Sequence, residues 1–219
     1  MQKKYKVLIG VGAGLAVLVG LWFLIPSQSQ NELENEEEAL TPVPKLFAEN
    51  DYIITDQSNE SGALIEIPKI GFKATAPVGW TISKQKTPIG GMEDYWIDMY
   101  SPDVTDLTQK SFLEQGCGIS VSAGDEEDNI QITKKEITDI KNNTDENLQG
   151  NYQYEIINIG PYEGVKWLST EKPFLGQFAG IDIPINDTQI ISLNAVFPPN
   201  YKEQCEPIWQ RFVKSITFD

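Results

Sequence analysis

The sequence predicts an α+β fold, in which helices cover a β-sheet, and it places one transmembrane helix before the folded domain. Three observations indicate this architecture. An apolar run fills most of the first 26 residues, short strand-like runs separated by turn residues extend over 60–219, and two later segments carry helix signals. Strands and helices do not alternate regularly along the chain, which argues against a βαβ array.

Residues 1–26 are predicted to form a membrane anchor. The run Val7–Ile25 contains no charged residue, and a helix of this length spans about 28 Å, close to the roughly 30 Å of a bilayer core. Lysines precede the run and glutamates follow it, so the positive-inside rule places the N-terminus in the cytoplasm. We therefore expect a single-pass protein of the plasma (inner) membrane with an extracytoplasmic C-terminal domain.

A cleaved signal peptide is the alternative interpretation of the same segment. Ser27 and Ser29 are small residues at the spacing that a signal peptidase recognises. The apolar core of a signal peptide is about 7–15 residues long, and this run is longer, which favours a retained anchor. Both interpretations place the rest of the chain outside the cytoplasm.

One face of the predicted anchor helix consists of small residues. Gly12, Ala16 and Gly20 recur at every fourth position, so a second helix can approach closely along this face. Self-association there would favour a stalk or assembly role for the domain. The alternative is the ordinary abundance of glycine and alanine in such helices.

Residues 27–59 are predicted to be an acidic linker that contains proline. Ser, Gln, Asn and Glu dominate the segment, Pro42 and Pro44 stiffen it, and no periodic pattern is sustained. We expect it to hold the domain, residues 60–219, away from the bilayer. A calcium or partner site in its acidic run is the alternative.

The strands of the domain are predicted from apolar and aromatic runs that end at proline, glycine or polar turn residues. Asn158–Gly164 is expected to form the turn of a hairpin. The expected strands are Ala63–Ile67, Phe72–Ala76, Trp80–Ser83, Tyr95–Tyr100, Ile119–Ala123, Tyr152–Ile159, Gly164–Thr170 and Ile190–Phe197.

The first helix of the domain is predicted to begin at Thr133. Thr133 and Glu136 have the spacing of a capping box, in which each side chain satisfies the other residue's backbone N–H. Gly150 suits the residue that follows the last turn. The apolar stripe that would pack on the sheet is formed by Ile137, Ile140, Thr144 and Leu148.

A second helix is predicted to open near Asn200, with Glu203 three residues later. Pro207 forfeits a hydrogen bond inside a helix, so the regular part is expected to start only there. The apolar face of this helix consists of Tyr201, Cys205, Ile208 and Phe212.

Charge excludes nucleic acid as an expected partner. The chain has 32 Asp and Glu residues against 17 Lys and Arg, a formal charge of −15, and three of its lysines lie in the predicted anchor. Such an acidic surface repels phosphate groups, and Arg211 is the only arginine available for bidentate phosphate contacts.

The absence of histidine from the chain restricts its possible chemistry. Ser-His-Asp and Cys-His catalysis and histidine-ligated zinc or haem all require this side chain. No catalytic residue and no cofactor is therefore assigned. Chemistry by paired carboxylates or by a lysine base remains open.

Cys117 and Cys205 are the two cysteines of the chain. Strand alternation places Cys117 with the inward-facing residues, and Cys205 lies on the apolar face of the second helix. An exported compartment permits oxidation, so a disulfide between them is predicted. Two free buried thiols are the alternative.

The acidic run after Gly124 is the strongest metal-site candidate, because calcium requires clustered oxygen ligands. It lacks the ligand spacing and the turn glycine of an EF-hand loop. Acids just before a helix also favour its dipole, so a solvated helix entry is the alternative. The candidate ligands are Asp125, Glu126, Glu127 and Asp128.

The tryptophans of the domain could line a ligand groove, although tryptophans in a small domain more often belong to the core. They are Trp80, Trp96, Trp167 and Trp209. Asp98 lies between Trp96 and Tyr100 on one strand face, which makes it a candidate for burial and a raised pKa. An exposed edge position is the expected outcome for Asp98.

Several segments of the domain resemble PsbP-like domains. The segment Phe72–Trp80, with Pro77-Val78-Gly79-Trp80, resembles the P-x-G-W opening of that family. A hairpin over Ile156–Thr170, the late strand Ile190–Phe197 and the ending Tyr201–Phe218 follow the family pattern in order. The resemblance implies an antiparallel sheet between helical layers, an α/β/α sandwich. It also implies a non-enzymatic role as an accessory or binding module.

The sequence thus predicts a non-enzymatic extracytoplasmic module that is tethered to the membrane and binds a partner protein or a small ligand. The alternative is a carboxylate-dependent hydrolase of the cell envelope, which would need two acids that converge in a cleft, at least one with a displaced pKa. No cofactor is expected, and calcium is the one metal considered.

Overall fold

The computed structural model describes residues 47–56, 61–89, 92–105, 113–125, 127–142, 144, 151–169 and 176–219. They belong to one compact unit, Pro42–Asp219. The predicted anchor, with Gly12, Ala16 and Gly20, lies outside the described residues. Within the described ranges, no helix has both the length and the apolar character that a membrane span requires.

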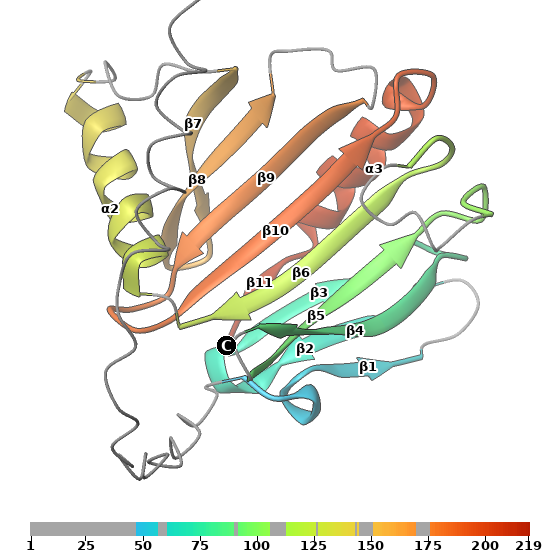
Figure 1. Ribbon diagram of the computed structural model, residues 1–219, viewed down its shortest axis with the longest axis horizontal. Coiled ribbons are helices and arrows are strands. Elements are labelled where there is room, and N and C mark those ends of the chain that lie inside the picture. The colour runs from blue at the N-terminus through green and yellow to red at the C-terminus, as the bar shows by residue number, and fades with distance from the viewer. Residues whose placement is uncertain are drawn as a thin grey trace, which may run out of the picture. The chain divides into compact units, whose positions relative to one another are not determined.

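The larger of two antiparallel sheets has seven strands in the order β4-β5-β6-β10-β9-β8-β7. Two meanders, β4-β5-β6 and β7-β8-β9, are each formed by consecutive strands, and β10 joins them by pairing with β6 on one side and β9 on the other (Figure 1). The strands are β4 Thr81–Ile89, β5 Met92–Tyr100, β6 Gly118–Gly124, β7 Tyr152–Ile159, β8 Tyr162–Ser169, β9 Gln177–Pro184 and β10 Ile190–Phe197.

The smaller sheet has four strands in the order β1-β2-β3-β11. Two 3-10 turns, η1 Glu49–Asp51 and η2 Pro68–Ile70, accompany it. Gly71 follows η2 with a φ of 66°, and a side chain there would collide with the backbone of Asp219. The strands are β1 Ile53–Thr55, β2 Leu64–Ile67, β3 Phe72–Thr75 and β11 Thr217–Phe218.

The main core lies between the larger sheet and a layer formed by the smaller sheet and helix α3, Lys202–Lys214. Along β6, Ile119, Val121 and Ala123 are buried in this core and alternate with less buried serines, the period-2 pattern of a strand. Helix α2, Glu127–Asn142, packs on β7, β8 and β9. Its buried residues Ile130 and Ile137 are not part of the main core, because α2 covers the opposite face of the larger sheet.

The predicted α+β class is confirmed in its coarse form, since the described elements are antiparallel sheets and two helices. The second sheet was not predicted. It shares one face of the larger sheet with α3, so that layer is not purely helical.

Residues 47–56 show how part of the predicted linker folds. The segment contains η1 and β1, and β1 pairs with β2. Phe47 and Tyr52 are buried in the main core. The domain boundary predicted at residue 60 therefore lies after elements that belong to the fold.

The prediction that the first helix begins at Thr133 is wrong, because α2 begins at Glu127. Thr133 lies inside the helix, where its hydroxyl donates to the carbonyl of Asn129 at 2.9 Å and caps nothing. Glu127 and Asp128 occupy the first turn, where acidic side chains favour the helix dipole. Ile130 extends the buried stripe of Ile137 by two turns toward the N-terminus.

The second helix contains Pro207 in its interior, so the prediction that the regular part starts there is also wrong. Cys205 precedes the proline and Trp209 follows it, and both are buried in the core. Packing on both sides of Pro207 holds the helix together despite the missing hydrogen bond.

The predicted strands are all present, although β4 and β5 are longer than expected. β9 was not predicted, because Gly180 and Pro184 are typical of turns. Gly180 is required within the strand, since a Cβ there would lie 2.1 Å from the indole of Trp167. The two short strands β1 and β11 were also not predicted.

Candidate functional site

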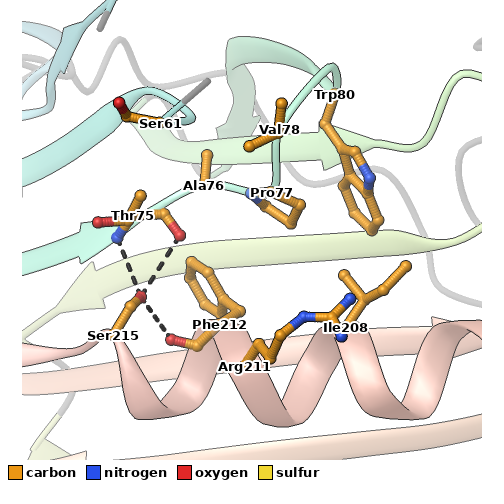
Figure 2. Close-up of a pocket in the computed structure, with 10 residues that line it drawn as sticks. All are labelled: Ser61, Thr75, Ala76, Pro77, Val78, Trp80, Ile208, Arg211, Phe212 and Ser215. Carbon is orange, nitrogen blue, oxygen red and sulfur yellow. Dashed lines mark hydrogen bonds between the residues drawn. The ribbon is translucent and has the colours of Figure 1, made fainter. Parts of the chain in front are cut away.

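A groove of about 370 Å³ lies between the Pro77–Trp80 turn and helix α3. Figure 2 shows the turn on one side of this groove and the helix on the other. The lining residues are Ser61, Thr75, Ala76, Pro77, Val78, Trp80, Ile208, Arg211, Phe212 and Ser215. Most of these side chains are apolar, which suits the groove to an apolar ligand surface.

The turn presents apolar side chains to solvent at the edge of the groove. The N–H of Trp80 donates to the carbonyl of Pro77 at 3.3 Å, and Gly79 has a φ of 77°, the conformation that the third position of a type II turn requires. Val78 is 55% exposed and is one of four large hydrophobic residues that are exposed in the described part of the chain. An exposed apolar residue beside a groove marks a candidate contact for a partner.

The helix wall of the groove is fixed near its C-terminal end. The hydroxyl of Ser215 accepts a hydrogen bond from the N–H of Thr75 at 3.0 Å and donates to the carbonyl of Phe212 at 2.7 Å (Figure 2). The bond to Thr75 joins the end of α3 to β3, so the groove is formed before any ligand arrives.

The predicted disulfide is present and fixes the same helix near its N-terminal end. Cys117 precedes β6 and Cys205 lies in the first turns of α3, with their Cα atoms 5.5 Å apart. Both cysteines are buried. The wall of the groove is therefore tied to the larger sheet at one end and to the smaller sheet at the other.

Among the described residues that line the groove, Arg211 is the one with a positive charge. It is exposed, and its side chain extends along α3 toward Ile208 (Figure 2). Among the described residues, its guanidinium has no ion-pair or hydrogen-bond partner. A free guanidinium beside apolar side chains can bind a carboxylate whose neighbours are apolar.

Asp98 is buried, so the expectation of an exposed edge position is wrong. Its side chain is 4% exposed, because β4 pairs along the outer side of β5 and removes β5 from the edge. The carboxylate accepts hydrogen bonds from Trp96 Nε1 at 2.9 Å, Ser120 Oγ at 2.8 Å and the Tyr100 hydroxyl at 3.0 Å. These neutral donors satisfy its oxygens and give it a structural role.

A similar carboxylate on β9 was missed by sequence reasoning. Asp182 accepts hydrogen bonds from Trp167 Nε1 at 2.8 Å and Ser192 Oγ at 2.6 Å. Burial raises the pKa of this carboxyl, and the two hydrogen bonds oppose the rise. Its strand was not predicted, so no sequence signal placed Asp182 beside Trp167.

The four tryptophans are divided between the groove, the core and the carboxylate clusters. Trp80 lines the groove, and Trp209 is buried in the main core. Trp96 and Trp167 each donate an indole N–H to a buried or largely buried aspartate. The core alternative is therefore confirmed for Trp209, and a ligand-binding role for Trp80 stays a prediction.

The acidic run lies at the start of α2. Asp125, Glu127 and Asp128 are exposed, and Glu126 lies outside the described residues. The described part of the chain contains no group of three or more acidic or cysteine side chains placed to hold a metal ion.

No family model matches the chain, and no curated protein matches it. Among solved structures, the chain is similar to the solution structure of cyanobacterial PsbP (CyanoP) from Synechocystis sp. PCC 6803. The identity is 12% and the TM-score is 0.38, over 83% of this chain and 99% of that chain. At this identity, function is inferred from the chain's own residues.

Proposed function

We propose that this protein is a non-enzymatic binding module, tethered to the outer side of the plasma (inner) membrane by its N-terminal helix, which binds a partner through the groove beside Pro77–Trp80. The occupant is a protein segment with a carboxylate flanked by apolar side chains. The guanidinium of Arg211 has no partner among the described residues and lies in a groove lined mostly by apolar side chains, and this observation carries the proposal.

Charge complementarity supports this choice of partner. The chain is strongly acidic, so most of its surface repels an acidic segment at a distance. Arg211 is the only arginine in the chain, and it lies where Val78, Trp80 and Ile208 offer apolar contact. A segment with one carboxylate among apolar residues matches this groove, whereas a highly acidic segment is repelled by the rest of the surface.

The extracytoplasmic location is supported by two independent features. The apolar run Val7–Ile25, preceded by lysines, has the length and flanking charges of an anchor. The disulfide between Cys117 and Cys205 is typical of proteins in oxidising compartments. The P-x-G-W motif and the elements that follow it support our further proposal that the domain is PsbP-like.

Site-specific photo-cross-linking in native membranes tests the proposal. A photoreactive residue replaces Val78 in the full-length protein, and a second variant carries it in place of Thr138, an exposed residue on α2. We expect a discrete cross-linked product from position 78 and none from position 138. Mass spectrometry of the cross-linked peptide should show an acidic residue next to apolar ones.

The role of Arg211 is tested by comparing two charge-removing variants of α3. Arg211→Gln should lower the yield of the product from position 78 at least tenfold, because it removes the carboxylate's partner. Lys214→Gln removes an exposed positive charge from the same helix and should leave the yield unchanged. Equal yields from positions 78 and 138, or a yield insensitive to Arg211→Gln, would show that the groove is not the binding site.

A carboxylate-dependent hydrolase of the cell envelope is the second candidate, and one observation favours it. Burial raises the pKa of Glu136 on α2, and the charge of Asp182 adds to the rise. Asp182 itself has a raised pKa, so two acids with displaced pKa values lie on α2 and on β9, the strand against which α2 packs. Release of soluble fragments from purified envelope polysaccharide, abolished by Glu136→Gln, would establish hydrolysis. No release by the unaltered protein would eliminate it.

A further inference from the structure

Each of the two sheets ends in two edge strands, which have a partner strand on one side only among the described residues. The edges of the smaller sheet, β1 and β11, are only three and two residues long. The edges of the larger sheet, β4 and β7, have nine and eight residues. A long edge strand can pair with a strand of another chain unless its sequence opposes this. The larger sheet therefore has two edges that are long enough to bind a further strand.

The edge strand β4 carries features that oppose such pairing. Lys84 and Lys86 are exposed along it, and Pro88 lacks the N–H that a strand ladder needs. The ammonium of Lys84 donates a hydrogen bond to the carbonyl of Glu49 at 3.1 Å, so the N-terminal segment already contacts this strand. The β4 edge is thus unsuited to a further strand.

The edge strand β7 has none of these features. Its sequence, Tyr152–Ile159, contains no lysine and no proline, and Glu155 is its only charged residue. Tyr152 is 42% exposed and is one of the four exposed large hydrophobic residues in the described part of the chain. Gln153, Glu155 and Asn158 are exposed as well. A long, accessible edge without lysine or proline is a site at which another strand can be added.

Space for a further chain lies on the core-facing side of this edge. Strand alternation places Gln153 and Glu155 on the same face of the sheet as Leu168 and Lys166, the residues of β8 with which they pair. These four residues are among those that line a hollow of about 400 Å³. Neither α3 nor the smaller sheet contributes a residue to its described lining, so the layer over the main core stops short of this part of β7.

Charge favours a second copy of the chain as the added partner. The chain carries a formal charge of −15, so most of its surface repels another copy. The β7 edge is locally balanced, because Glu155 pairs with Lys166 and because Glu163 of β8 pairs with Lys141 of α2. Two copies can therefore meet along β7 without bringing its acidic side chains together unpaired.

The sequence of β7 selects one register for such a pair. When two identical antiparallel strands are related by a two-fold axis across the sheet, the residue on the axis lies opposite its own copy. The two axes that overlap most of Tyr152–Ile159 pass through Glu155 and Ile156. An axis at Glu155 places two carboxylates opposite each other, which is unfavourable. An axis at Ile156 instead pairs Ile156 with its own copy and places Glu155 opposite Ile157.

We propose that two copies of this chain pair antiparallel along β7, about a two-fold axis at Ile156, so that their larger sheets form one continuous sheet. The backbone groups of the two edges supply hydrogen bonds, and the paired Ile156 side chains supply an apolar contact at the centre. The contact is isologous, so it closes as a dimer and leaves no β7 edge open. No residue of β7 lines the groove at Arg211, so the dimer leaves that groove accessible.

Cysteine cross-linking of the purified full-length protein in a maltoside detergent tests the pairing. Cys117 and Cys205 are the only cysteines of the chain and are joined to each other, so an introduced cysteine is the only free thiol. Ile156→Cys should form a disulfide-linked dimer under mild oxidation, because opposite residues of paired strands have Cβ atoms roughly 4.5–5.5 Å apart. Asn158→Cys is the control and should form at least tenfold less dimer, since Asn158 lies opposite Tyr154 of the second copy.

A mixture of two variants tests the register without changing Ile156. Glu155→Cys, carrying an affinity tag, is mixed with untagged Ile157→Cys, and we expect a cross-linked product that contains both chains. Each variant alone should form at least tenfold less dimer. Circular dichroism confirms that each variant is folded. No dimer from Ile156→Cys and none from the mixture, or an equal yield from Asn158→Cys, would overturn the proposal.

Lysine substitutions test whether β7 itself holds the copies together. Gln153→Lys with Asn158→Lys gives β7 the edge lysines that β4 has, and should lower the yield of the Ile156→Cys dimer at least tenfold. Gln131→Lys with Thr138→Lys adds the same charge to exposed positions of α2 and should not lower it. An equal yield from both lysine pairs would overturn the proposal. Cross-linking of Ile156→Cys in native membranes to a different protein, and not to a second copy, would also overturn it.

Discussion

The hydroxyl of Tyr52 pairs with the backbone of Ala123 in both directions. It accepts a hydrogen bond from the Ala123 N–H at 2.9 Å and donates to the Ala123 carbonyl at 3.2 Å. The pairing of β5 with β6 ends at Trp96 and Ser122, so Ala123 has no strand partner on that side. Tyr52 takes the place of that partner and joins the N-terminal segment to the larger sheet.

Replacing Tyr52 by phenylalanine should destabilise the protein by about 1–3 kcal/mol, because two buried backbone groups lose their partner. The measurement is the midpoint of urea unfolding. Tyr162→Phe is the matched control, since the described structure shows no hydrogen bond to the Tyr162 hydroxyl, and its stability should stay within about 0.5 kcal/mol of the unaltered protein. Equal midpoints for the two variants would refute the pairing.

Tyr52 should also resist ionisation, because burial raises its pKa to about 12. Nearby acids add to the rise, and the hydrogen bond to Ala123 opposes it. Spectrophotometric titration of the folded protein should therefore show fewer tyrosines ionising near pH 10 than titration of a denatured sample. Tyr52→Phe should remove a high-pH transition and leave the remaining tyrosines unchanged.

Removing the disulfide should lower the free energy of unfolding by about 4–5 kcal/mol in the chain-entropy model, because Cys117 and Cys205 close a long loop. The double variant Cys117→Ala, Cys205→Ala is compared with the unaltered protein in chemical denaturation. A reducing agent should shift the unaltered protein toward the variant and leave the variant unchanged. Coincident curves for both proteins without reductant would contradict the bond.

The variant Gly180→Ala should destabilise the protein by about 1–3 kcal/mol, because the added methyl group displaces the indole of Trp167 from β9. Gly124→Ala is the control. A Cβ at Gly124 meets only Ile190 at 3.8 Å, an ordinary contact. Gly180→Ala should also alter tryptophan fluorescence, which Gly124→Ala should not. Similar stability of the two variants would mean that the indole does not lie on Gly180.

The variant Glu136→Gln should stabilise the protein at pH 7, because it removes a charge that burial and Asp182 disfavour. A carboxyl whose pKa is raised in the folded state contributes stability at a pH below its pKa in the unfolded state, which is 4.5. This contribution is lost as the pH rises through the pKa of the folded state. The advantage of the variant should therefore be largest near pH 7 and should vanish below pH 4.5. Urea midpoints across this range measure it.

Asp187→Asn is the control for the pH experiment, because its expected effect on stability at pH 7 is opposite to that of Glu136→Gln. Its hydrogen bond and ion pair with Lys134 lower the pKa of Asp187. The contribution of this carboxylate to stability is present at a pH above its pKa in the unfolded state, which is 3.8. It is lost as the pH falls through the lower pKa of the folded state. Asp187→Asn should therefore be less stable than the unaltered protein at pH 7, and the difference should close in acid. The same trend in both variants would show that neither pKa shift has the stated cause.

Strands with one buried face could be predicted from the sequence. The residues Ile119–Ala123 and Ile190–Phe197 have apolar side chains at alternate positions, and both segments form central strands. β9 could not be predicted in the same way, because the Gly180 that makes room for Trp167 looks like a turn residue. Its function in the strand depends on a side chain from β8, which no local pattern reveals.

The groove could be predicted only in parts. The Pro77–Trp80 turn and the single arginine are evident in the sequence, but they are far apart along the chain. Their proximity depends on the bonds of Ser215 to β3 and on the disulfide near the start of α3. Asp98 illustrates the same limit, since its burial depends on the position of β5 between β4 and β6 and on the hydroxyl of Ser120 on β6.

The position of β10 between the two meanders has a consequence for biosynthesis. Residues 81–124 and 152–184 each form three consecutive antiparallel strands, and such local pairings form quickly. Until Ile190–Phe197 has left the ribosome, β6 and β9 each lack a neighbour and expose backbone groups along one edge. A nascent chain interrupted before β10 is therefore two separate half-sheets with unpaired edges. Chaperones can bind these edges at this stage.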